Sequence, residues 1–200
     1  MVQNMSCKIY MDHAATTEML PQVRKAMEPY LMEEYGNAST SYEMGRRTRE
    51  ALEGAREQIA MLIKAKPEEI FFTSGGSESD NWVIKNVAAE KKEKGKHVIT
   101  SKIEHHAVLR SCEYLEKLGY ELTYLDVDAY GVIDLAQLRE VLREDTTLVS
   151  VMTGNNEIGT IEPLDAGDGN IISHRCGAGH RADSAFPEPA SGGLSECKCT

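Results

Sequence analysis

The sequence has few basic residues and no long apolar run. It contains 22 Lys and Arg residues against 32 Asp and Glu residues, so its formal net charge is −10. A negative protein is not attracted to nucleic acid or to an anionic membrane, which argues against both as partners. No apolar stretch reaches the length of a membrane-spanning helix, and residues 1–8 lack the apolar core of a signal peptide. We therefore expect a cytoplasmic protein that acts on a small soluble ligand.

Cysteine is too scarce and too irregularly spaced for a disulfide framework. The odd number of five suits free thiols in a reducing compartment. They are Cys7, Cys112, Cys176, Cys197 and Cys199. The His and Cys residues near the C-terminus fit no standard zinc spacing, so we expect no metal site. Cys112 lies beside Val108 and Leu115 in a helical pattern, which predicts a packed thiol rather than a nucleophile.

Helical and strand patterns alternate from Ile9 to Met152, in a chain with 41% hydrophobic residues. Hydrophobic spacing predicts helices over 21–31, 41–63, 77–94, 105–118 and 135–142, with Gly95 ending the third. Runs of β-prone residues predict strands over 70–73, 97–101, 121–126 and 147–152. Strands that alternate with helices are typical of parallel sheets. The sequence therefore predicts an α/β fold, with a parallel-type sheet between two layers of flanking helices.

The run over 70–82 combines a strand, a tight glycine turn and a helix start. Gly75 and Gly76 follow the expected strand. Ser77 and Ser79 then supply hydroxyls of the kind that cap a helix. The N–H groups at a helix N-terminus attract phosphate, and glycine lets a phosphate approach closely. The run contains neither G-x-x-x-x-G-K-[ST] nor G-x-G-x-x-G, so by itself it is more typical of an ordinary loop than of a phosphate site.

Three polar segments lie at the carboxyl ends of expected strands. They are the glycine turn at 75–77, Glu104-His105-His106 and Asn155-Asn156. In open parallel sheets, ligands bind beyond the carboxyl ends of the strands. The three segments together therefore predict one ligand site at this edge of the sheet.

Five ordered motifs cover most of the chain. They are YMDHAATT at 10–17, YGNAS at 35–39, TSGGSESDN at 73–81, TSKIEH at 100–105 and VSVMTGNNEIG at 149–159. In order and spacing they resemble the cysteine desulfurases, the pyridoxal-phosphate enzymes of class V aminotransferase type. Ala38 stands where that family usually has proline. The resemblance implies the large domain of a fold-type I pyridoxal-phosphate-dependent transferase.

The resemblance also implies a cofactor, a reaction and roles for matching residues. The cofactor is pyridoxal 5′-phosphate, whose phosphate Gly76 and Ser77 would hold. His105 would stack on the pyridine ring and move protons, and Asn156 would bond the phenolic oxygen. The reaction takes sulfur from L-cysteine, giving L-alanine and an enzyme persulfide for iron-sulfur cluster or thio-cofactor assembly. The implied partners are a second copy of the chain and a sulfur-acceptor scaffold protein.

Each of these residues also has an ordinary structural interpretation. A histidine that opens a helix, such as His105, is usually solvated or capping, and asparagines after a strand are usually turn formers. Two other functional interpretations also remain open at this point. One is another class V aminotransferase or a selenocysteine lyase, and the other is a non-catalytic partner of a full-length homologue.

The resemblance ends at Leu164. We expect residues 1–164, with a leading segment at 1–20, to be the N-terminal part of the transferase large domain. Residues 165–200 are expected to be a divergent tail, disordered or translated in a shifted frame, since they are rich in glycine and poor in large apolar residues. The resemblance implies an aspartate for the pyridine nitrogen in this region, which does not appear there, and a cofactor-binding lysine further on, beyond residue 200. We therefore expect this chain to be inactive by itself.

Overall fold

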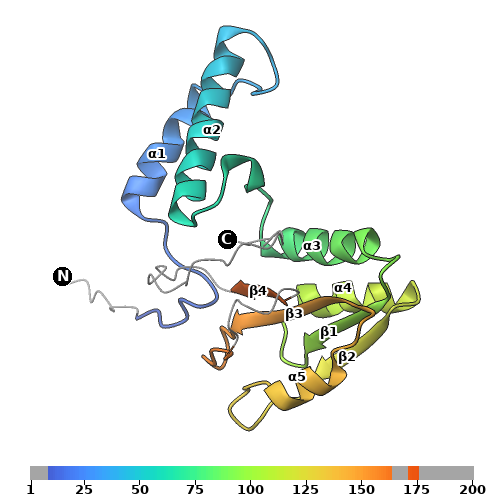
Figure 1. Ribbon diagram of the computed structural model, residues 1–200. Coiled ribbons are helices and arrows are strands. Elements are labelled where there is room, and N and C mark those ends of the chain that lie inside the picture. Colours follow the sequence, from blue (N-terminus) through green and yellow to red (C-terminus); the bar gives the residue numbers. More distant parts are fainter. Residues whose placement is uncertain (1–8, 164–170, 176–200) are drawn as a thin grey trace, which may run out of the picture. The chain divides into compact units, whose positions relative to one another are not determined.

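The computed structural model describes residues 9–163 and 171–175 (Figure 1). The expected boundary at Leu164 and the tail over 165–200 lie outside the described residues, apart from one strand at 171–175. The chain divides into two compact units, Glu18–Phe72 and the remainder on either side of it. In this described part, no helix combines the length and the apolar character needed to cross a membrane.

The unit at 18–72 is helical. It contains α1 (Pro21–Met32), α2 (Glu43–Leu62) and the short 3-10 helix η1 (Pro67–Glu69). Both α-helices lie within two residues of their expected bounds. The YGNAS turn packs closely on the start of α2, since a Cβ on Gly36 would lie 2.6 Å from the carbonyl carbon of Met44.

The larger unit contains a parallel sheet and its helices. Its elements are α3 (Gly76–Glu90), β1 (His97–Ser101), α4 (His106–Lys117), β2 (Glu121–Leu125), α5 (Leu135–Val141), β3 (Thr146–Gly154) and β4 (Ile171–Arg175). The strand order is β2-β1-β3-β4, and all neighbouring strands are parallel. The expected strand at 97–101 has the observed bounds, and those at 121–126 and 147–152 differ from β2 and β3 by at most two residues at either end.

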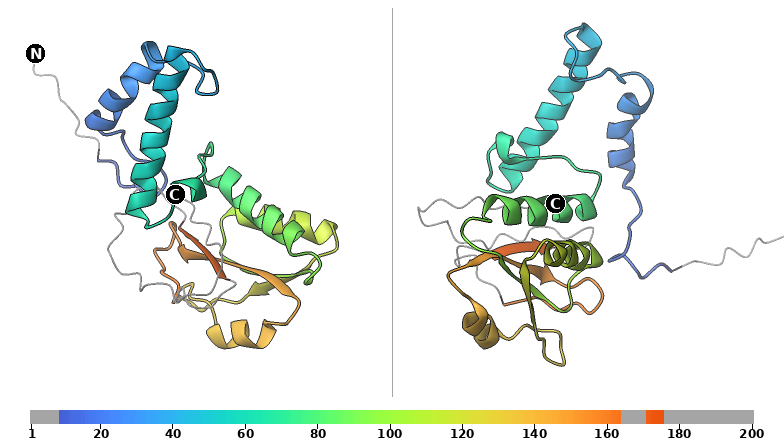
Figure 2. Two further views of the ribbon diagram at one scale, coloured as in Figure 1. Left: turned by 45° about the horizontal axis from the view of Figure 1, so that its top comes forward. Right: turned by 90° about the vertical axis from the view of Figure 1, so that its right-hand side faces the viewer.

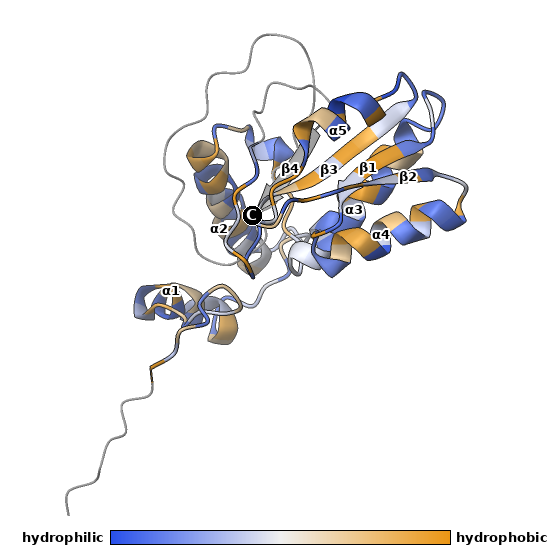
Figure 3. Cartoon of the chain, turned by 90° about the horizontal axis from the view of Figure 1, so that it is seen from below, coloured by the Kyte–Doolittle hydropathy of each residue, from blue (hydrophilic) through white to orange (hydrophobic). Residues whose placement is uncertain are grey.

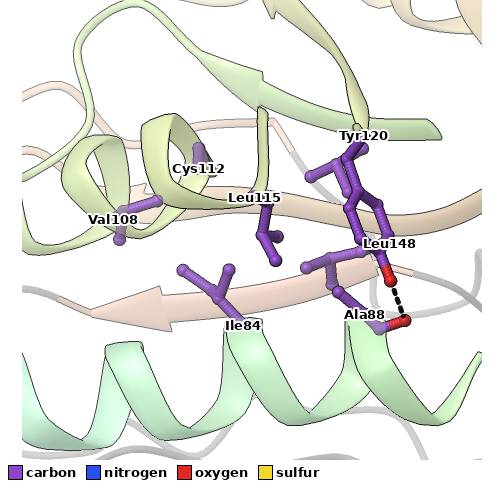
Figure 4. Packing of buried hydrophobic residues seen from close by; sticks show 8 residues of the cluster. Ile84, Ala88, Val108, Cys112, Leu115, Tyr120 and Leu148 are labelled. Atoms are coloured by element: carbon purple, nitrogen blue, oxygen red, sulfur yellow. Dashed lines mark hydrogen bonds between the residues drawn. The ribbon is translucent and has the colours of Figure 1, made fainter. Parts of the chain in front are cut away.

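Helices cover both faces of this sheet, as expected. Figures 1 and 2 show α3 and α4 on one face and α5 on the other. The first core contains Ile84, Ala88, Val98, Val108, Cys112, Leu115, Tyr120 and Leu148 (Figure 4). The second contains Ile99, Leu125, Ile133, Leu138, Val149 and Val151. Alternate residues of β1 and β3 therefore face opposite cores, and Figure 3 shows both strands as the most hydrophobic part of the sheet.

The strand expected at 70–73 is wrong. Ile70 is buried, but Phe71 and Phe72 are 66% and 46% exposed, and no strand is formed there. The carbonyl of Ile70 accepts a hydrogen bond from the Arg56 guanidinium instead of from a neighbouring strand. A β-prone run becomes a strand only when another strand pairs with it, and none does so within the described residues.

Two expectations about the ends of α3 are also wrong. Gly75 is the N-cap residue of α3, no side chain caps the helix, and Ser77 lies within its first turn. The helix ends at Glu90, so Gly95 does not cap it. Glycine is needed at 95 for a different reason, because a Cβ there would lie 2.1 Å from the carbonyl oxygen of Asp145.

Candidate functional site

The strand order places a candidate site at the carboxyl ends of β1 and β3. The chain runs from β1 outward to β2 and then returns past β1 to form β3, so the order reverses at β1. Such a reversal opens a crevice for ligands at the carboxyl ends of the strands. His105 follows β1 and Asn156 follows β3. In Figure 1, α3 begins on the side of the sheet where β3 ends.

The N-terminus of α3 is open to a ligand. The first N–H groups of an α-helix have no partner within the helix, and no side chain caps this one. A Cβ built on Gly75 or Gly76 meets no atom within 4 Å, and Ser77 is exposed. The turn is therefore free of bulk at the place where the sequence predicts a phosphate.

The turn before α3 is held by the carboxylate of Glu78. That carboxylate accepts hydrogen bonds from the Ser74 N–H at 2.6 Å and the Ser74 hydroxyl at 2.7 Å. These two bonds lower the pKa of Glu78, the hydroxyl having the larger effect. Ser79, expected to cap the helix, contacts the hydroxyl of Thr73 at 2.7 Å instead. Side chains thus shape the turn and leave its Gly76 and Ser77 N–H groups to other partners.

His105 is an exposed N-cap residue of α4. Its Nδ1 accepts a hydrogen bond from the Ala107 N–H at 3.1 Å. In the neutral ring the proton therefore lies on Nε2, which faces away from the helix end. The His106 ring lies 6.4 Å from it, centre to centre. The capping interpretation of His105 is thus confirmed, and the cap also fixes how its imidazole is presented.

The two asparagines after β3 differ in their contacts. The Asn155 Oδ1 accepts from the N–H groups of Glu157 and Ile158, as a turn former does, and its Nδ2 donates to the Ile103 carbonyl at 3.1 Å. Asn156 is half-buried, and its amide has no hydrogen-bond partner among the residues that the structure describes. Asn156 is therefore the one of the two that is available to a ligand.

The structure brings two of the three predicted segments into contact. The loops that carry His105 and Asn156 are joined through Asn155 and Ile103. No hydrogen bond within the described residues joins Ser77 to either loop. Glu104 is buried directly before His105, whereas the sequence predicted for it only a place in the polar segment 104–106. Its burial has no signal in the sequence, because it depends on β3 passing beside β1.

The residues present fit a phosphorylated ring cofactor. An uncapped helix start with two unhindered glycines suits a phosphate, and the half-buried Asn156 amide, which has no partner in the described part of the chain, suits a ring oxygen. A cavity elsewhere, lined by Glu53, Arg56 and Phe71 among others, belongs to the helical unit and contains none of the predicted site residues. Fold and site together define a parallel α/β protein with a candidate ligand site at its sheet edge.

Comparison with known proteins identifies the family. The family model of the class-V aminotransferases matches residues 9–185, and the chain belongs to this family. The resemblance predicted from the sequence motifs is thus confirmed, as is the α/β fold with its parallel sheet.

Curated relatives are named as cysteine desulfurases. Cysteine desulfurase IscS of Dictyoglomus turgidum is 56% identical over 160 residues, which are 80% of this chain and 41% of the relative. Cysteine desulfurase IscS of Methanosarcina thermophila is 51% identical over 156 residues, or 78% of this chain and 39% of the relative. The chain therefore spans about 40% of the length of these relatives.

Solved structures show the same fold. A NifS-like protein matches with a TM-score of 0.77 and 37% identity, over 84% of this chain and 48% of that one. A structure described as SspA in complex with cysteine matches with a TM-score of 0.76 and 37% identity, over 83% of this chain and 49% of that one.

Proposed function

We propose that this chain supplies the N-terminal part of a pyridoxal-phosphate-dependent cysteine desulfurase. The proposed reaction transfers sulfur from L-cysteine to an enzyme thiol, which leaves L-alanine and a persulfide. The observation that carries the proposal is the combination of about 50% identity to cysteine desulfurases with the open helix start and polar loops at one sheet edge. The persulfide sulfur would serve iron-sulfur cluster or thio-cofactor assembly.

The residues of this chain would bind and orient the cofactor. When bound, pyridoxal phosphate supplies an electron sink for carbanion chemistry on an amino acid. The N–H groups of Gly76 and Ser77 and the Ser77 hydroxyl would hold the phosphate at the positive end of the α3 dipole. The Asn156 amide would donate a hydrogen bond to the phenolic oxygen. Both groups thereby orient the ligand against the carboxyl edge of the sheet.

His105 is the proposed proton-handling residue. Its Nδ1 is engaged with the Ala107 N–H, so Nε2 is the atom that holds or gives up a proton toward the ligand. The imidazole face would lie against the cofactor ring. Because the ring is exposed and anchored at one nitrogen, it offers both a stacking surface and a defined proton position.

We also infer two partners and a location. A second copy of the chain and a sulfur-acceptor scaffold are the proposed partners. Exposed apolar residues at the two ends of α1, which are Leu20 directly before the helix and Leu31 and Met32 within it, support a surface that another protein segment covers. The free thiol of Cys112 fits a reducing compartment such as the cytoplasm.

The proposal is tested with the purified chain and pyridoxal 5′-phosphate. Circular dichroism in the cofactor's visible absorption band reports binding, because the free cofactor is not chiral. We expect a band whose half-saturation rises about tenfold in Ser77→Ala, since a charged ligand loses one hydrogen bond. An unaltered titration in Ser77→Ala, or no band in the unchanged chain, contradicts the proposal.

Turnover is tested in the same samples. After L-cysteine is added, alanine and sulfide are measured against a cofactor-only control. We expect no alanine above that control, because the chain spans only about 40% of the length of the cysteine desulfurases that it matches. Alanine formation that depends on His105 would instead assign activity to this chain.

A further inference from the structure

A buried carboxylate joins the ends of the two strands that lead into the candidate site. Glu104 is 5% exposed and lies between β1 and α4. Its Oε1 accepts a hydrogen bond from the Met152 N–H of β3 at 2.6 Å and one from the Ser101 hydroxyl of β1 at 3.2 Å. A carboxylate is costly to bury unless hydrogen bonds compensate it, so these contacts hold it in place.

Glu104 acts where the pairing between β1 and β3 stops. The last paired residues are Thr100 and Ser150, and β1 ends at Ser101. The Met152 N–H lies beyond that end, yet it still has an acceptor on the β1 side. The side chain of Glu104 thus supplies the oxygen that the backbone of a longer β1 would have supplied.

The residues held in this way are neighbours of the proposed cofactor contacts. Glu104 directly precedes His105, and Met152 lies four residues before Asn156. We propose that Glu104 is a positioning residue, which sets the distance between His105 and Asn156 by joining the loop that carries His105 to the end of β3, which leads to Asn156. The inference rests on the proposed function in one respect, namely that His105 and Asn156 bind the same ligand.

A second hydrogen bond supports this link, and a second buried carboxylate provides a control for it. The Asn155 amide joins the loop after β3 to the loop after β1 through the Ile103 carbonyl, so the loop after β1 is held at two points, by the end of β3 and by the loop that follows it. Glu162 is also buried, at 4% exposure, but its Oε2 accepts from the Ile133 N–H at 2.9 Å, on the segment before α5. Glu162→Ala is therefore a matched control for loss of a buried carboxylate elsewhere in the unit.

Hydrogen–deuterium exchange tests the link without any cofactor. We expect Glu104→Ala to raise exchange at least tenfold in both 103–107 and 152–156, with β2 unchanged. Glu104→Gln keeps a carbonyl oxygen as acceptor, so it is expected to restore most of the protection. Glu162→Ala is expected to raise exchange in the Ile133 segment instead. Uniform exchange across the unit, or a change in only one of the two loops, overturns the proposal.

Cofactor titrations then test positioning itself. We expect Glu104→Ala to weaken pyridoxal 5′-phosphate binding about tenfold. In the Glu104→Ala variant, a further His105→Ala substitution should weaken cofactor binding by less than twofold. Ser77→Ala should weaken cofactor binding in that variant as much as it does in the unchanged chain. If His105→Ala weakens cofactor binding as much in the Glu104→Ala variant as in the unchanged chain, the positioning role of Glu104 is overturned. If the unchanged chain binds no cofactor, the proposed function is wrong, and the exchange measurement alone decides on the link.

Discussion

Asn155 donates a hydrogen bond from its Nδ2 to the carbonyl oxygen of Ile103, 3.1 Å away. The bond connects the loop after β3 to the loop after β1. Because the Asn155 Oδ1 also accepts from Glu157 and Ile158, one side chain shapes its own turn and fixes it to the neighbouring loop. The relative position of the two loops is therefore encoded in part by a residue that is not itself a proposed ligand contact.

The substitution Asn155→Asp separates the turn contacts of Asn155 from its hydrogen bond to Ile103. The carboxylate keeps acceptors for the turn but cannot donate to Ile103, so we expect a loss of about 1 kcal/mol in the free energy of unfolding, measured in urea. The matched control is Asn37→Asp, where the side chain only accepts, from the Ser39 N–H at 2.9 Å. Equal stability in the two variants would show that the Ile103 contact contributes nothing.

His97 is expected to make stability depend on pH. It is buried, with Nδ1 2.8 Å from the Thr146 hydroxyl and Nε2 2.9 Å from that of Thr123. Burial, and then the charge of Arg143, lower the pKa of His97 below 6.5, although Glu121 and Asp145 oppose this.

The sign follows from proton uptake. As the pH falls below about 6.5, the unfolded chain binds a proton at this position before the folded chain does. The free energy of unfolding should therefore fall with pH until the folded-state pKa is reached. Urea unfolding at pH 7.5, 6.5 and 5.5 should show a smaller decrease in His97→Gln than in the unchanged chain. Parallel curves for the two proteins would rule out this contribution.

Tyr120 connects the turn after α4 to α3 inside the first core (Figure 4). Its hydroxyl donates to the Ala88 carbonyl at 2.6 Å and is buried. Tyr120→Phe should lower the free energy of unfolding by about 1 kcal/mol, since the ring packing is kept and only the hydrogen bond is lost. Tyr114→Phe, at a ring that is 47% exposed, should change it by less than about 0.5 kcal/mol.

Cys112 should resist alkylation in the folded protein. Burial, followed by the charges of Glu104 and Glu113, raises the pKa of its thiol to about 12, and the side chain is fully buried in the first core. Thiolate is the reactive form, so little is present at pH 8. Mass analysis after iodoacetamide treatment should find Cys112 unmodified in buffer and fully modified in urea. Equal modification in both samples would contradict its packed position.

Much of the sheet could be predicted from the sequence because the signals there are local. The apolar run of β1, ended by polar residues, predicted its bounds at His97–Ser101. The run over 70–73 is also rich in β-prone residues but has no partner strand among the described residues. Strand formation depends on such pairing, which a single segment does not encode.

The candidate site was predictable in its residue types but not in its connections. Glycine, serine, histidine and asparagine at three strand ends could be located because parallel topology gathers those ends. The role of Glu104 could not, since its acceptor position depends on where β1 stops beside β3. Likewise Ser77 and Ser79 were expected to cap α3, whereas Gly75 occupies that position.

The most direct test of the account compares binding of pyridoxal 5′-phosphate with binding of pyridoxal, which lacks the phosphate. Equilibrium titration of the purified chain measures both dissociation constants under the same conditions. Because the open N-terminus of α3 is proposed to hold the phosphate, we expect pyridoxal 5′-phosphate to bind at least about tenfold more tightly, and inorganic phosphate to compete with it. Equal affinities for the two ligands, without competition by phosphate, would contradict the central claim that this helix start is a cofactor phosphate site.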